Sequence, residues 1–478
     1  MREPFELGLT FDDVLLVPRR SAVSTRRQVD TRTQLCRGIE LAIPIVSASM
    51  DTVTEATMAI AMAREGGIGI IHRFLPIEDH VAEVRRVKRA ESVVIDTPYT
   101  LGPEGTVRQA AAFMDEHGSA GILVIDRERR LLGIVTARDV LFEDSADRPI
   151  TSVMTPRERL ITAPAGTPVE EAKQILHRHR IEKLPLVDQA GRLVGLISTR
   201  DIQSRMRYPR ATKDPRGRLR VGAAIGVRGD YLERAEALAA AEVDVLVIDI
   251  AHGHSDLSFA TIDAVRTRCA AVPVIAGNVA TVEGTRDLIA RGVDGVKVGV
   301  GPGSTCTTRV VTGAGVPQLT AILECAEAAA GSGVPVIGDG GIRSSGDLTK
   351  ALAAGAATVM LGNLLAGTEE SPGASVSRNG RQFKLYRGMA SLWASAERRD
   401  MPQEDDLLSE IVPEGVEALV PYRGRTAAVL SQLVGGLRSG MSYCGATTVA
   451  ELRERARFIR VTDAGVRESM PHDVDTLS

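Results

Sequence analysis

The chain has 478 residues, of which 44% are apolar and 25% charged, with a formal net charge of −3. This length exceeds one ordinary hydrophobic core, and the composition is that of a globular α/β protein, which excludes the disordered and fibrous classes. The nearly neutral charge excludes a general attraction to nucleic acid or anionic lipid, so that any bound phosphate is held by local groups.

The amino-terminal segment, "MREPFELGLTFDDVLL", lacks the charged-then-apolar layout of a signal peptide. No apolar run in the chain approaches the ~20 residues that a membrane helix needs. The five cysteines are scattered without metal-ligand spacing, and a reducing compartment tolerates such a set. We therefore expect a cytoplasmic protein with no membrane partner.

Short runs rich in β-branched residues recur along the chain, and each ends in glycine or a polar residue. Such runs predict buried parallel strands. The eight runs are residues 43–51, 66–73, 221–227, 243–254, 272–279, 294–304, 334–341 and 357–363. Because alanine-rich helical patterns separate most of them, the predicted fold class is α/β, a (β/α)8 or TIM barrel.

A long insertion between the second and third runs contains an internal repeat. Residues 119–141 and 181–203 share one layout: a strand, a polar turn, a second strand and a Ser/Thr-x-x-Asp motif that opens a helix. The predicted domains are a first part of the barrel at 1–91, a tandem module at 92–208 and the rest of the barrel at 209–478.

The Ser/Thr-x-x-Asp motifs of the repeat, Thr136 with Asp139 and Ser198 with Asp201, allow two interpretations. In the first, each pair is a helix capping box. In the second, the hydroxyl and the carboxylate hold a ribose while the helix N-terminus faces a phosphate. The basic segment that follows, 205–220, is interpreted as a solvated linker rather than a nucleic-acid site.

Polar residues and glycines gather at the carboxyl ends of the predicted strands, where a barrel places its chemistry. Gly340-Gly341 and Gly362-Asn363 end two consecutive late strands, and backbone N–H groups beside glycines can approach phosphate oxygens. These two turns predict a phosphate cradle. The other residues at these ends are Ser47–Met50, Asp249, His252, Asn278 and the loop 301–309.

Cys306 differs from the other cysteines because it lies in a turn rich in glycine and hydroxyl residues, "VGVGPGSTCTTR" (298–309). A thiol attacks only as the thiolate, from an ordinary pKa of ~8.5, and the N–H donors of such a turn favour that form. A barrel cysteine is otherwise commonly a small buried apolar residue. We predict that Cys306 is a nucleophile and that Thr308 passes a proton together with a distant carboxylate.

Motifs spread over nearly the whole chain resemble those of the IMP dehydrogenase/GMP reductase family. They are "LTFDDVLLVP", "SASMDTVTEA", "GGIGIIH", "GNVAT", "VGPGSTCTTR", "GDGGIRSSGD" and "YRGM". The inserted repeat is similar to a paired CBS domain, also called a Bateman module. The resemblance implies GMP or IMP as substrate and product, an adenine or guanine nucleotide at the CBS pair, and a homotetramer or octamer.

The resemblance also implies roles for particular residues. Cys306 attacks purine C2 to form a covalent thioimidate, with Thr308 and Glu414 as a proton relay. Asp249 and Asn278 lie on the side of the nicotinamide cofactor. The nucleotide-binding residues are Ser49, Met50, Ser304, Asp339, Gly341, Gly362, Asn363, Tyr386, Gly388 and Met389. A monovalent cation such as K⁺ is expected at Gly301, Gly303, Cys306 and Glu468.

The two branches of the family differ in what happens at purine C2. The dehydrogenase sends a hydride to NAD and then hydrolyses the thioimidate, while the reductase expels ammonia from GMP and receives a hydride from NADPH. The dehydrogenase activates water with an Arg-Tyr pair, but this chain has Arg398-Arg399 followed by Asp400. Residues 17–33 also look like the reductase pattern.

Other segments resemble the dehydrogenase branch: the CBS pair, residues 412–438 and the tail, "AGVRESMPHD". Residues 249–255 are intermediate between the branches. Because ammonia loss needs only the relay and no activated water, we predict an NADPH-dependent GMP reductase. The alternatives are an NAD-dependent IMP dehydrogenase and a non-enzymatic nucleotide sensor, and the sensor would not need Cys306 or its loop.

Overall fold

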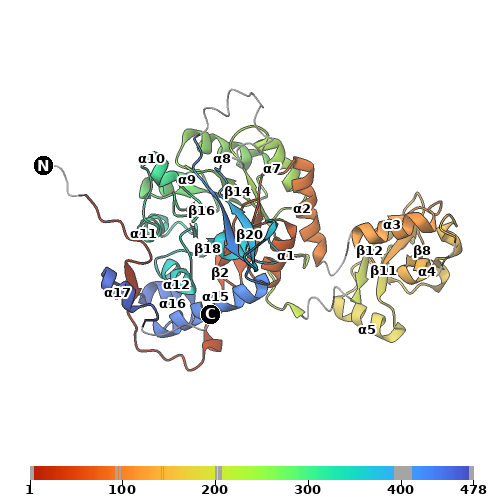
Figure 1. Cartoon of the computed structure of the whole chain (residues 1–478). Helices are drawn as coiled ribbons and strands as arrows, with labels where there is room; N and C mark the ends of the chain where they lie inside the picture. Colours follow the sequence, from red (N-terminus) through yellow and green to blue (C-terminus); the bar gives the residue numbers. More distant parts are fainter. Residues whose placement is uncertain are drawn as a thin grey trace. The chain divides into compact units, whose positions relative to one another are not determined.

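The computed structural model describes residues 5–472 except 92–94, 96–97, 142, 144, 200–201, 203–206 and 392–411. The chain divides into two compact units. The first comprises Met1–Ala90, Arg210–Asp214 and Leu219–Ser478, and the second comprises Glu91–Pro209 and Pro215–Arg218. Figure 1 shows the first unit built around a barrel and the second as the inserted segment in orange and yellow.

Eight parallel strands form a closed barrel in the order β13-β14-β15-β16-β17-β18-β4-β5. The strands are β4 (Ile45–Ser47), β5 (Ile68–Ile71), β13 (Gly222–Ile225), β14 (Val245–Asp249), β15 (Val274–Val279), β16 (Gly295–Val298), β17 (Val336–Asp339) and β18 (Thr358–Leu361). Each lies within one of the eight runs identified in the sequence. The TIM-barrel prediction is therefore confirmed.

The amino-terminal end of the barrel is closed by a hairpin of β2 (Thr33–Cys36) and β3 (Ile39–Leu41). Its apolar residues are fully or almost fully buried and pack against inward-facing side chains of the barrel strands, such as Ile70 and Val247. Burial of one such side chain stabilises the fold by about 1.5–3 kcal/mol. Because this end is filled with hydrocarbon, polar chemistry is left to the carboxyl end.

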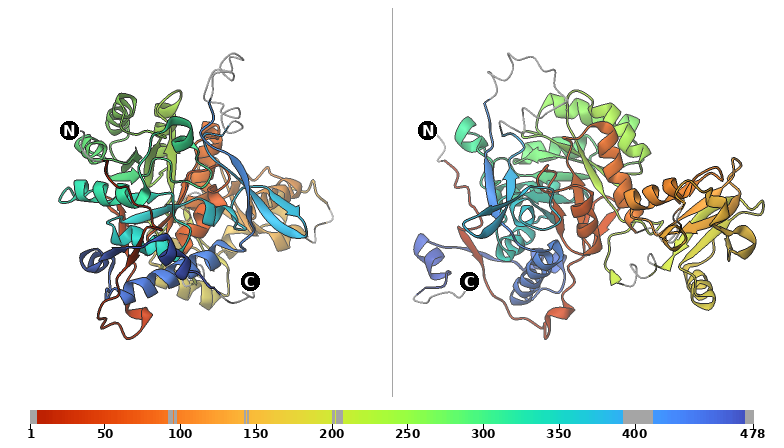
Figure 2. Two further views of the ribbon diagram at one scale, coloured as in Figure 1. Left: turned by 60° about the vertical axis from the view of Figure 1, so that its left-hand side comes forward. Right: turned by 45° about the vertical axis from the view of Figure 1, so that its right-hand side comes forward.

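Helices cover the outside of the strands, as the views in Figures 1 and 2 show. They are α1 (Ala56–Arg64), α2 (Ile77–Ala90), α7 (Tyr231–Ala240), α8 (Asp256–Arg268), α9 (Val282–Ala290), α11 (Gln318–Ala329), α12 (Ser345–Ala353) and α15 (Thr426–Tyr443). Several start at a hydroxyl cap: Ser255, Thr281 and Ser344 each accept a hydrogen bond from a backbone N–H three residues on. Such a cap starts each of these three helices soon after its strand ends.

The segments after the last barrel strand form a small antiparallel sheet. Its strands are β19 (Ser375–Arg378), β20 (Arg381–Arg387) and β21 (Glu417–Pro421). In the carboxyl-terminal region, α16 (Val449–Arg455) is followed by β22 (Phe458–Arg460), which pairs with β1 (Val14–Leu16), and by α17 (Asp463–Glu468). No helix in the described part of the chain is both long enough and apolar enough to span a bilayer.

The second unit contains two hairpins with the same pairing pattern. They are β7 (Gly121–Ile125) with β8 (Leu131–Thr136), and β11 (Lys183–Val187) with β12 (Leu193–Ser198). In each, the first residue of one strand pairs with the last residue of the next, and the register shifts once before the final pair. A helix precedes each hairpin, α3 (Val107–His117) or α5 (Val169–His179). The repeat seen in the sequence is thus a repeat of structure.

Candidate active site

Four polar side chains from different strand ends join a buried lysine at the barrel mouth, and we call this group the mouth cluster. Ser49 Oγ donates to Asp249 Oδ2 at 2.6 Å. Lys297 Nζ donates to Asp249 Oδ1 at 2.8 Å and to Asp339 Oδ2 at 2.7 Å. It also donates to Asn278 Oδ1, and Asn278 Nδ2 donates to Asp339 Oδ2 at 3.0 Å. The barrel therefore brings together four residues that the sequence placed in the site.

Lys297 is the member of the mouth cluster that the sequence analysis missed. It lies in β16, between apolar neighbours, and only 1% of its surface is exposed. Gly277 gives it room, because a Cβ at that position would lie 2.7 Å from the Lys297 Cβ and 2.5 Å from its carbonyl oxygen. The available signal was a lysine inside an otherwise buried strand, a residue type that is rarely buried without a charged partner.

The charges of the mouth cluster stabilise one another. Burial alone would raise the pKa of Asp249, but the Lys297 ammonium, aided by hydrogen bonds from Lys297 and Ser49, holds that pKa below its ordinary value. Burial would lower the pKa of Lys297, and the two carboxylates instead raise it. Asp249 and Lys297 are thus both charged at neutral pH, and the contribution of Asp249 is lost only as the pH falls through its lowered pKa.

Cys306, Thr308 and Glu414 form a hydrogen-bonded chain, which we call the thiol line. The thiol donates to Thr308 Oγ1 (Sγ–Oγ1 3.1 Å), and the Thr308 hydroxyl donates to Glu414 Oε2 (2.8 Å). Cys306 is partly exposed, whereas the other four cysteines are buried. The structure therefore places the predicted nucleophile, the predicted relay hydroxyl and the predicted carboxylate in contact in the predicted order.

Backbone pairing holds the two segments of the thiol line together. Thr307 N donates to Glu414 O at 2.8 Å, and Val416 N donates to Thr305 O at 2.9 Å. These bonds make a short antiparallel bridge in which Cys306 lies opposite Gly415. The carboxylate is thus positioned by the backbone rather than by its own flexible side chain alone.

Arg309 joins the two ends of the segment 300–316, which carries Cys306 and which we call the cysteine loop. Its Nε donates to Val300 O at 3.1 Å, and its Nη2 donates to Val316 O, so one guanidinium joins the two ends of the loop. Gly301 and Gly315 lie against this side chain, and a Cβ at either position would come within 2.6 Å of Arg309 Cγ. Two of the loop's glycines are therefore explained by packing against Arg309.

The predicted phosphate side is organised around Tyr386 of β20. Its hydroxyl donates to Met50 Sδ at 3.7 Å, and a Cβ on Gly362 would lie 2.7 Å from the same hydroxyl. Burial raises the pKa of Tyr386, while hydrogen bonding with Ser304 and Thr305 acts in the opposite direction. Met50, Ser304, Gly362 and Tyr386 are therefore close neighbours.

The other predicted phosphate ligands follow strand ends in the same way. Gly341 follows β17 and has φ +79°, a conformation that favours glycine, and Asn363 begins the short helix α13 (Asn363–Ala366) after β18. Gly388 N donates to Val416 O at 3.0 Å, which joins the start of the Gly388-Met389 segment to the strand after Glu414.

An ion pair that the sequence analysis did not identify connects this segment to the first barrel strand. Arg387 Nε donates to Asp51 Oδ2 at 2.7 Å, and the Arg387 Nη2 lies 2.6 Å from the same oxygen. Asp51 follows β4 closely, and Arg387 is the last residue of β20. The pair therefore holds the segment that leads to Gly388 against the loop that carries Ser49 and Met50.

Some predicted site residues are not brought together. The helix α17, which ends in Glu468, lies beside α16 and away from α10 (Thr308–Thr312), the helix that follows Cys306 (Figures 1 and 2). The single chain therefore does not assemble the expected cation site from Gly301, Gly303, Cys306 and Glu468. Among the described residues, no group of three His, Cys, Asp or Glu side chains could hold a metal ion.

In the second unit, Thr136 and Asp139 make the contacts of a helix cap. Both the backbone N–H and the hydroxyl of Thr136 donate to Asp139 Oδ2, at 2.8 and 2.7 Å. Ser198 ends β12, while Asp201 lies outside the described residues. Arg398, Arg399 and Asp400 lie outside them as well.

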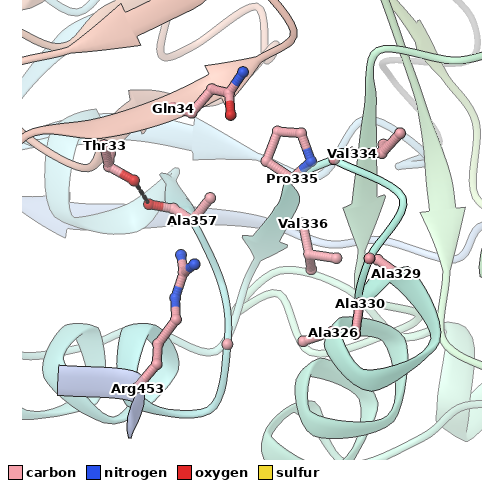
Figure 3. A pocket seen from close by; sticks show the side chains of 13 residues that line it. Thr33, Gln34, Ala326, Ala329, Ala330, Val334, Pro335, Val336, Ala357 and Arg453 are labelled. Atoms are coloured by element: carbon pink, nitrogen blue, oxygen red, sulfur yellow. Dashed lines mark hydrogen bonds between the residues drawn. The ribbon is translucent and has the colours of Figure 1, made fainter. Parts of the chain in front are cut away.

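A hollow of about 290 Å³ lies at the opposite, amino-terminal end of β17. Figure 3 shows Arg453 extending from α16 toward Ala357, whose carbonyl accepts a hydrogen bond from Thr33. Arg453 itself donates to Ala356 O at 2.9 Å. None of the predicted site residues lines this hollow. The candidate active site therefore consists of the mouth cluster and the thiol line, at the other end of the barrel.

The known proteins that resemble this chain carry the names of two different activities. A family model described as "IMP dehydrogenase / GMP reductase domain" matches residues 8–472. The chain is 53% identical over 475 residues to inosine-5'-monophosphate dehydrogenase of Nitrosopumilus maritimus, covering 98% of this chain and 99% of that protein. It is 54% identical over 470 residues to the enzyme of the same name from Aquifex aeolicus, covering 98% and 96%.

Similar solved structures include GMP reductase from Trypanosoma brucei. A variant of that enzyme in complex with guanosine 5'-monophosphate has a TM-score of 0.94 and 45% identity, covering 98% of this chain and 99% of the other. The same enzyme in complex with guanosine 5'-triphosphate has a TM-score of 0.82 and 42% identity, covering 96% and 98%.

Proposed function

The chain belongs to the IMP dehydrogenase/GMP reductase family, and within that family we propose that it is an NADPH-dependent GMP reductase. Membership makes it an oxidoreductase of purine nucleotide metabolism. The reaction would convert GMP to IMP and ammonia. The observation that carries the shared chemistry is the thiol line, because one hydroxyl joins the nucleophile to a carboxylate that can hold and return a proton. The choice of the reductase branch rests on residues 398–400 of the sequence.

In this reaction the Cys306 thiol would pass its proton through Thr308 to Glu414 while its sulfur forms a bond to purine C2, and the amino group at C2 would leave as ammonia. The departing nitrogen needs a proton, which Glu414 can supply through the Thr308 hydroxyl. The product of this half is a thioimidate between Cys306 and the purine. NADPH, when bound on the side of Asp249, would supply the hydride for C2, and Cys306 would then leave as the thiolate with release of IMP.

The mouth cluster fits the ribose groups of a nucleotide and of a dinucleotide. Asp339 retains 22% side-chain exposure, and in the described part of the chain its Oδ1 has no hydrogen-bond partner, so that this oxygen can accept from a ribose hydroxyl. Asp249 is exposed to a similar degree, 25%, on the opposite side of Lys297. The glycines at 341 and 362 leave room for a phosphate beside Tyr386.

The reductase direction is favoured over the dehydrogenase because of what each must activate. An arginine has a pKa above ~12 and loses a proton only in a dedicated site. In this sequence Asp400 follows Arg398-Arg399 where the dehydrogenase branch has a tyrosine, and a nearby carboxylate favours the charged guanidinium. Ammonia loss requires no such base, and the thiol line meets its need for a proton.

A second candidate function is an NAD-dependent IMP dehydrogenase that makes XMP. It is favoured by the curated relatives of that name, which are more than 50% identical over nearly the whole chain. In that case the thiol line would accept a proton from water rather than give one to ammonia. The two functions share the binding site and the thioimidate, and they differ in what leaves C2 when the thioimidate forms and in what then attacks it.

The test is to incubate the purified protein with GMP and NADPH and, separately, with IMP and NAD. We expect NADPH oxidation with release of ammonia in the first mixture and no appreciable NADH in the second. Formation of XMP from IMP at a useful rate would contradict the reductase proposal. A Cys306→Ala variant run in both mixtures controls for contaminating activities.

The second unit is proposed to be a paired CBS module that binds an adenine or guanine nucleotide. The support is its duplicated hairpin, with a Ser/Thr-x-x-Asp motif after each copy. Nucleotide titration of the full-length protein and of a variant lacking residues 92–208 tests this assignment. Binding at one extra class of sites in the full-length protein is expected, and its absence would favour the capping interpretation.

The assembly is proposed to be a homotetramer or octamer located in the cytoplasm. Exposed valines surround the thiol line, among them Val310 in α10 and Val412 and Val416 on either side of Glu414, and a neighbouring subunit would cover them. A K⁺ site would take Glu468 from a second copy, because α17 lies away from the cysteine loop of its own chain. The five unpaired cysteines fit a reducing compartment.

A further inference from the structure

Lys297 has a position that the mechanism has not used. Its Nζ binds oxygen atoms of three side chains, one from the end of each of β14, β15 and β17. The lysine itself is covered, whereas both carboxylates that it binds are partly exposed at the mouth. A substrate can therefore reach the partners of Lys297 but not Lys297.

We propose that Lys297 is a positioning residue that fixes both halves of the binding site, the nucleotide ribose through Asp339 and the cofactor through Asp249. This inference rests on the proposed function for the roles of the two aspartates. One ammonium would thus set the position of two ligands at once. Lys297 would make no contact with the reacting atoms.

The electrostatic part of this role follows from the two distances. Asp249 Oδ1 and Asp339 Oδ2 both lie within 2.8 Å of one nitrogen, so the two carboxylates are close neighbours. Without the ammonium they would repel each other, and the pKa of Asp249 would rise. A protonated carboxyl accepts ribose hydroxyls less well than a carboxylate.

The orientational part follows from the other hydrogen bonds in the cluster. Lys297 Nζ binds the Asn278 carbonyl oxygen, which turns Asn278 Nδ2 toward Asp339 Oδ2 and Gly299 O at 3.0 and 2.7 Å. Ser49 holds the second oxygen of Asp249. Loss of Lys297 would release one oxygen of each aspartate and the amide that lies between them.

Lys88 provides a matched control. It is also buried, at 5% exposure, and its Nζ lies between two carboxylates, 2.5 Å from Asp244 and 3.2 Å from Asp214. Asp244 precedes β14, at the end of the barrel opposite the mouth. Lys88→Met therefore removes the same chemistry from the same barrel without touching the proposed site.

The experiment compares Lys297→Met and Lys88→Met in the full-length protein. Lys297→Met should raise the dissociation constants of both the nucleotide and the cofactor by at least about tenfold, the scale of one lost charge-assisted contact in each half. The acid limb of its kcat/KM profile should move to higher pH, because Asp249 loses the ammonium that lowers its pKa. Lys88→Met should lower only the melting temperature.

A double variant guards against a simple folding defect. Lys297→Met with Asp249→Asn removes one carboxylate together with the ammonium, so the remaining Asp339 has no like charge beside it. We expect this variant to melt at a higher temperature than Lys297→Met alone and to recover affinity for GMP but not for NADPH. If Lys297→Met does not fold, the double variant is compared with Asp249→Asn alone.

Two outcomes would overturn the role of Lys297: unchanged affinities and acid limb in Lys297→Met, or a double variant that binds GMP more weakly than Lys297→Met does. Binding is measured by calorimetry with GMP, IMP, NADPH and NAD, so the result does not depend on turnover. A wild-type protein that makes XMP would contradict the reductase proposal and leave this test intact.

Discussion

The two halves of the candidate site are built in different ways. The mouth cluster stands on the ends of barrel strands, carries a net negative charge and is held by side-chain hydrogen bonds to one buried lysine. The thiol line runs from the turn before α10 through the first residue of that helix to the segment before β21, and its hydroxyl and carboxylate are 106 residues apart in the chain. Backbone pairing between residues 305–307 and 414–416 brings them together.

This difference separates binding from chemistry. Strand ends of a closed barrel are rigidly placed, so they suit groups that must hold a ligand in one position. The thiol line is completed by backbone bonds between two segments far apart in the chain, so its proton path is positioned separately from the strand ends. Changes in the thiol line should therefore lower turnover with little effect on affinity, and changes in the mouth cluster should do the reverse.

The largest expected effect is the loss of the nucleophile. Cys306→Ala should lower turnover by at least about 10⁴-fold, because one thiol carries the covalent step, and GMP should still bind. Single-turnover kinetics and calorimetry measure the two quantities, with Cys325→Ala, a buried cysteine of α11, as the control. Turnover near the wild-type rate would rule out the thioimidate mechanism.

Loss of the proton donor should have the next largest effect. Glu414→Gln keeps the hydrogen bond to Thr308 but removes the proton, and kcat should fall about 10²–10³-fold with little change in KM for GMP. Ammonia release should slow far more than it does in Arg399→Ala. Glu417→Gln, in the adjacent β21, is the matched control. A large rise in KM with normal kcat would mean that Glu414 binds rather than relays.

A change in the mouth cluster should show the opposite pattern. Ser49→Ala removes the hydroxyl that donates to Asp249 Oδ2, and KM for the cofactor should rise by about fivefold, the scale of one hydrogen bond, with kcat nearly unchanged. Because this bond helps to lower the pKa of Asp249, its loss should raise that pKa. Cofactor binding should therefore weaken at a higher pH than in the wild type as the solution is acidified.

An equal fall in kcat and in cofactor affinity in Ser49→Ala would break the proposed separation of the two halves. The nucleotide affinity of the variant is measured alongside, because the family resemblance also assigns Ser49 to the nucleotide, while Asp339 keeps its contacts with Lys297 and Asn278.

The smallest effect is expected from removing the second unit. A variant without residues 92–208 should keep kcat within about twofold, because an inserted domain has its own core. The buried apolar clusters of the two units share no residue. The ion pairs of Lys88 with Asp214 and Asp244 lie wholly in the first unit. Steady-state turnover at matched protein concentration measures this. A large loss would mean that the unit contributes to the site.

The eight barrel strands were predictable from the sequence because their signal is local. A strand buried on both faces is a short run of apolar residues, and the glycine or polar residue that ends it marks the carboxyl end of the barrel. Asp249, Asn278, Asp339 and Cys306 could be assigned to one face on that basis. The roles of Glu414 and Tyr386, which lie outside the barrel strands, came only from the resemblance to a family.

The tertiary structure decided the features that depend on distant contacts. Lys297 carries no local mark of function, and it becomes intelligible only when three strand ends place two carboxylates and an amide around it. The antiparallel bridge between Cys306 and Gly415 and the pair of Arg387 with Asp51 likewise join segments far apart in the chain. Apolar periodicity reports which face of an element is buried, whereas the partner of a buried charge is set by how the elements pack, and that is why only the folded barrel shows it.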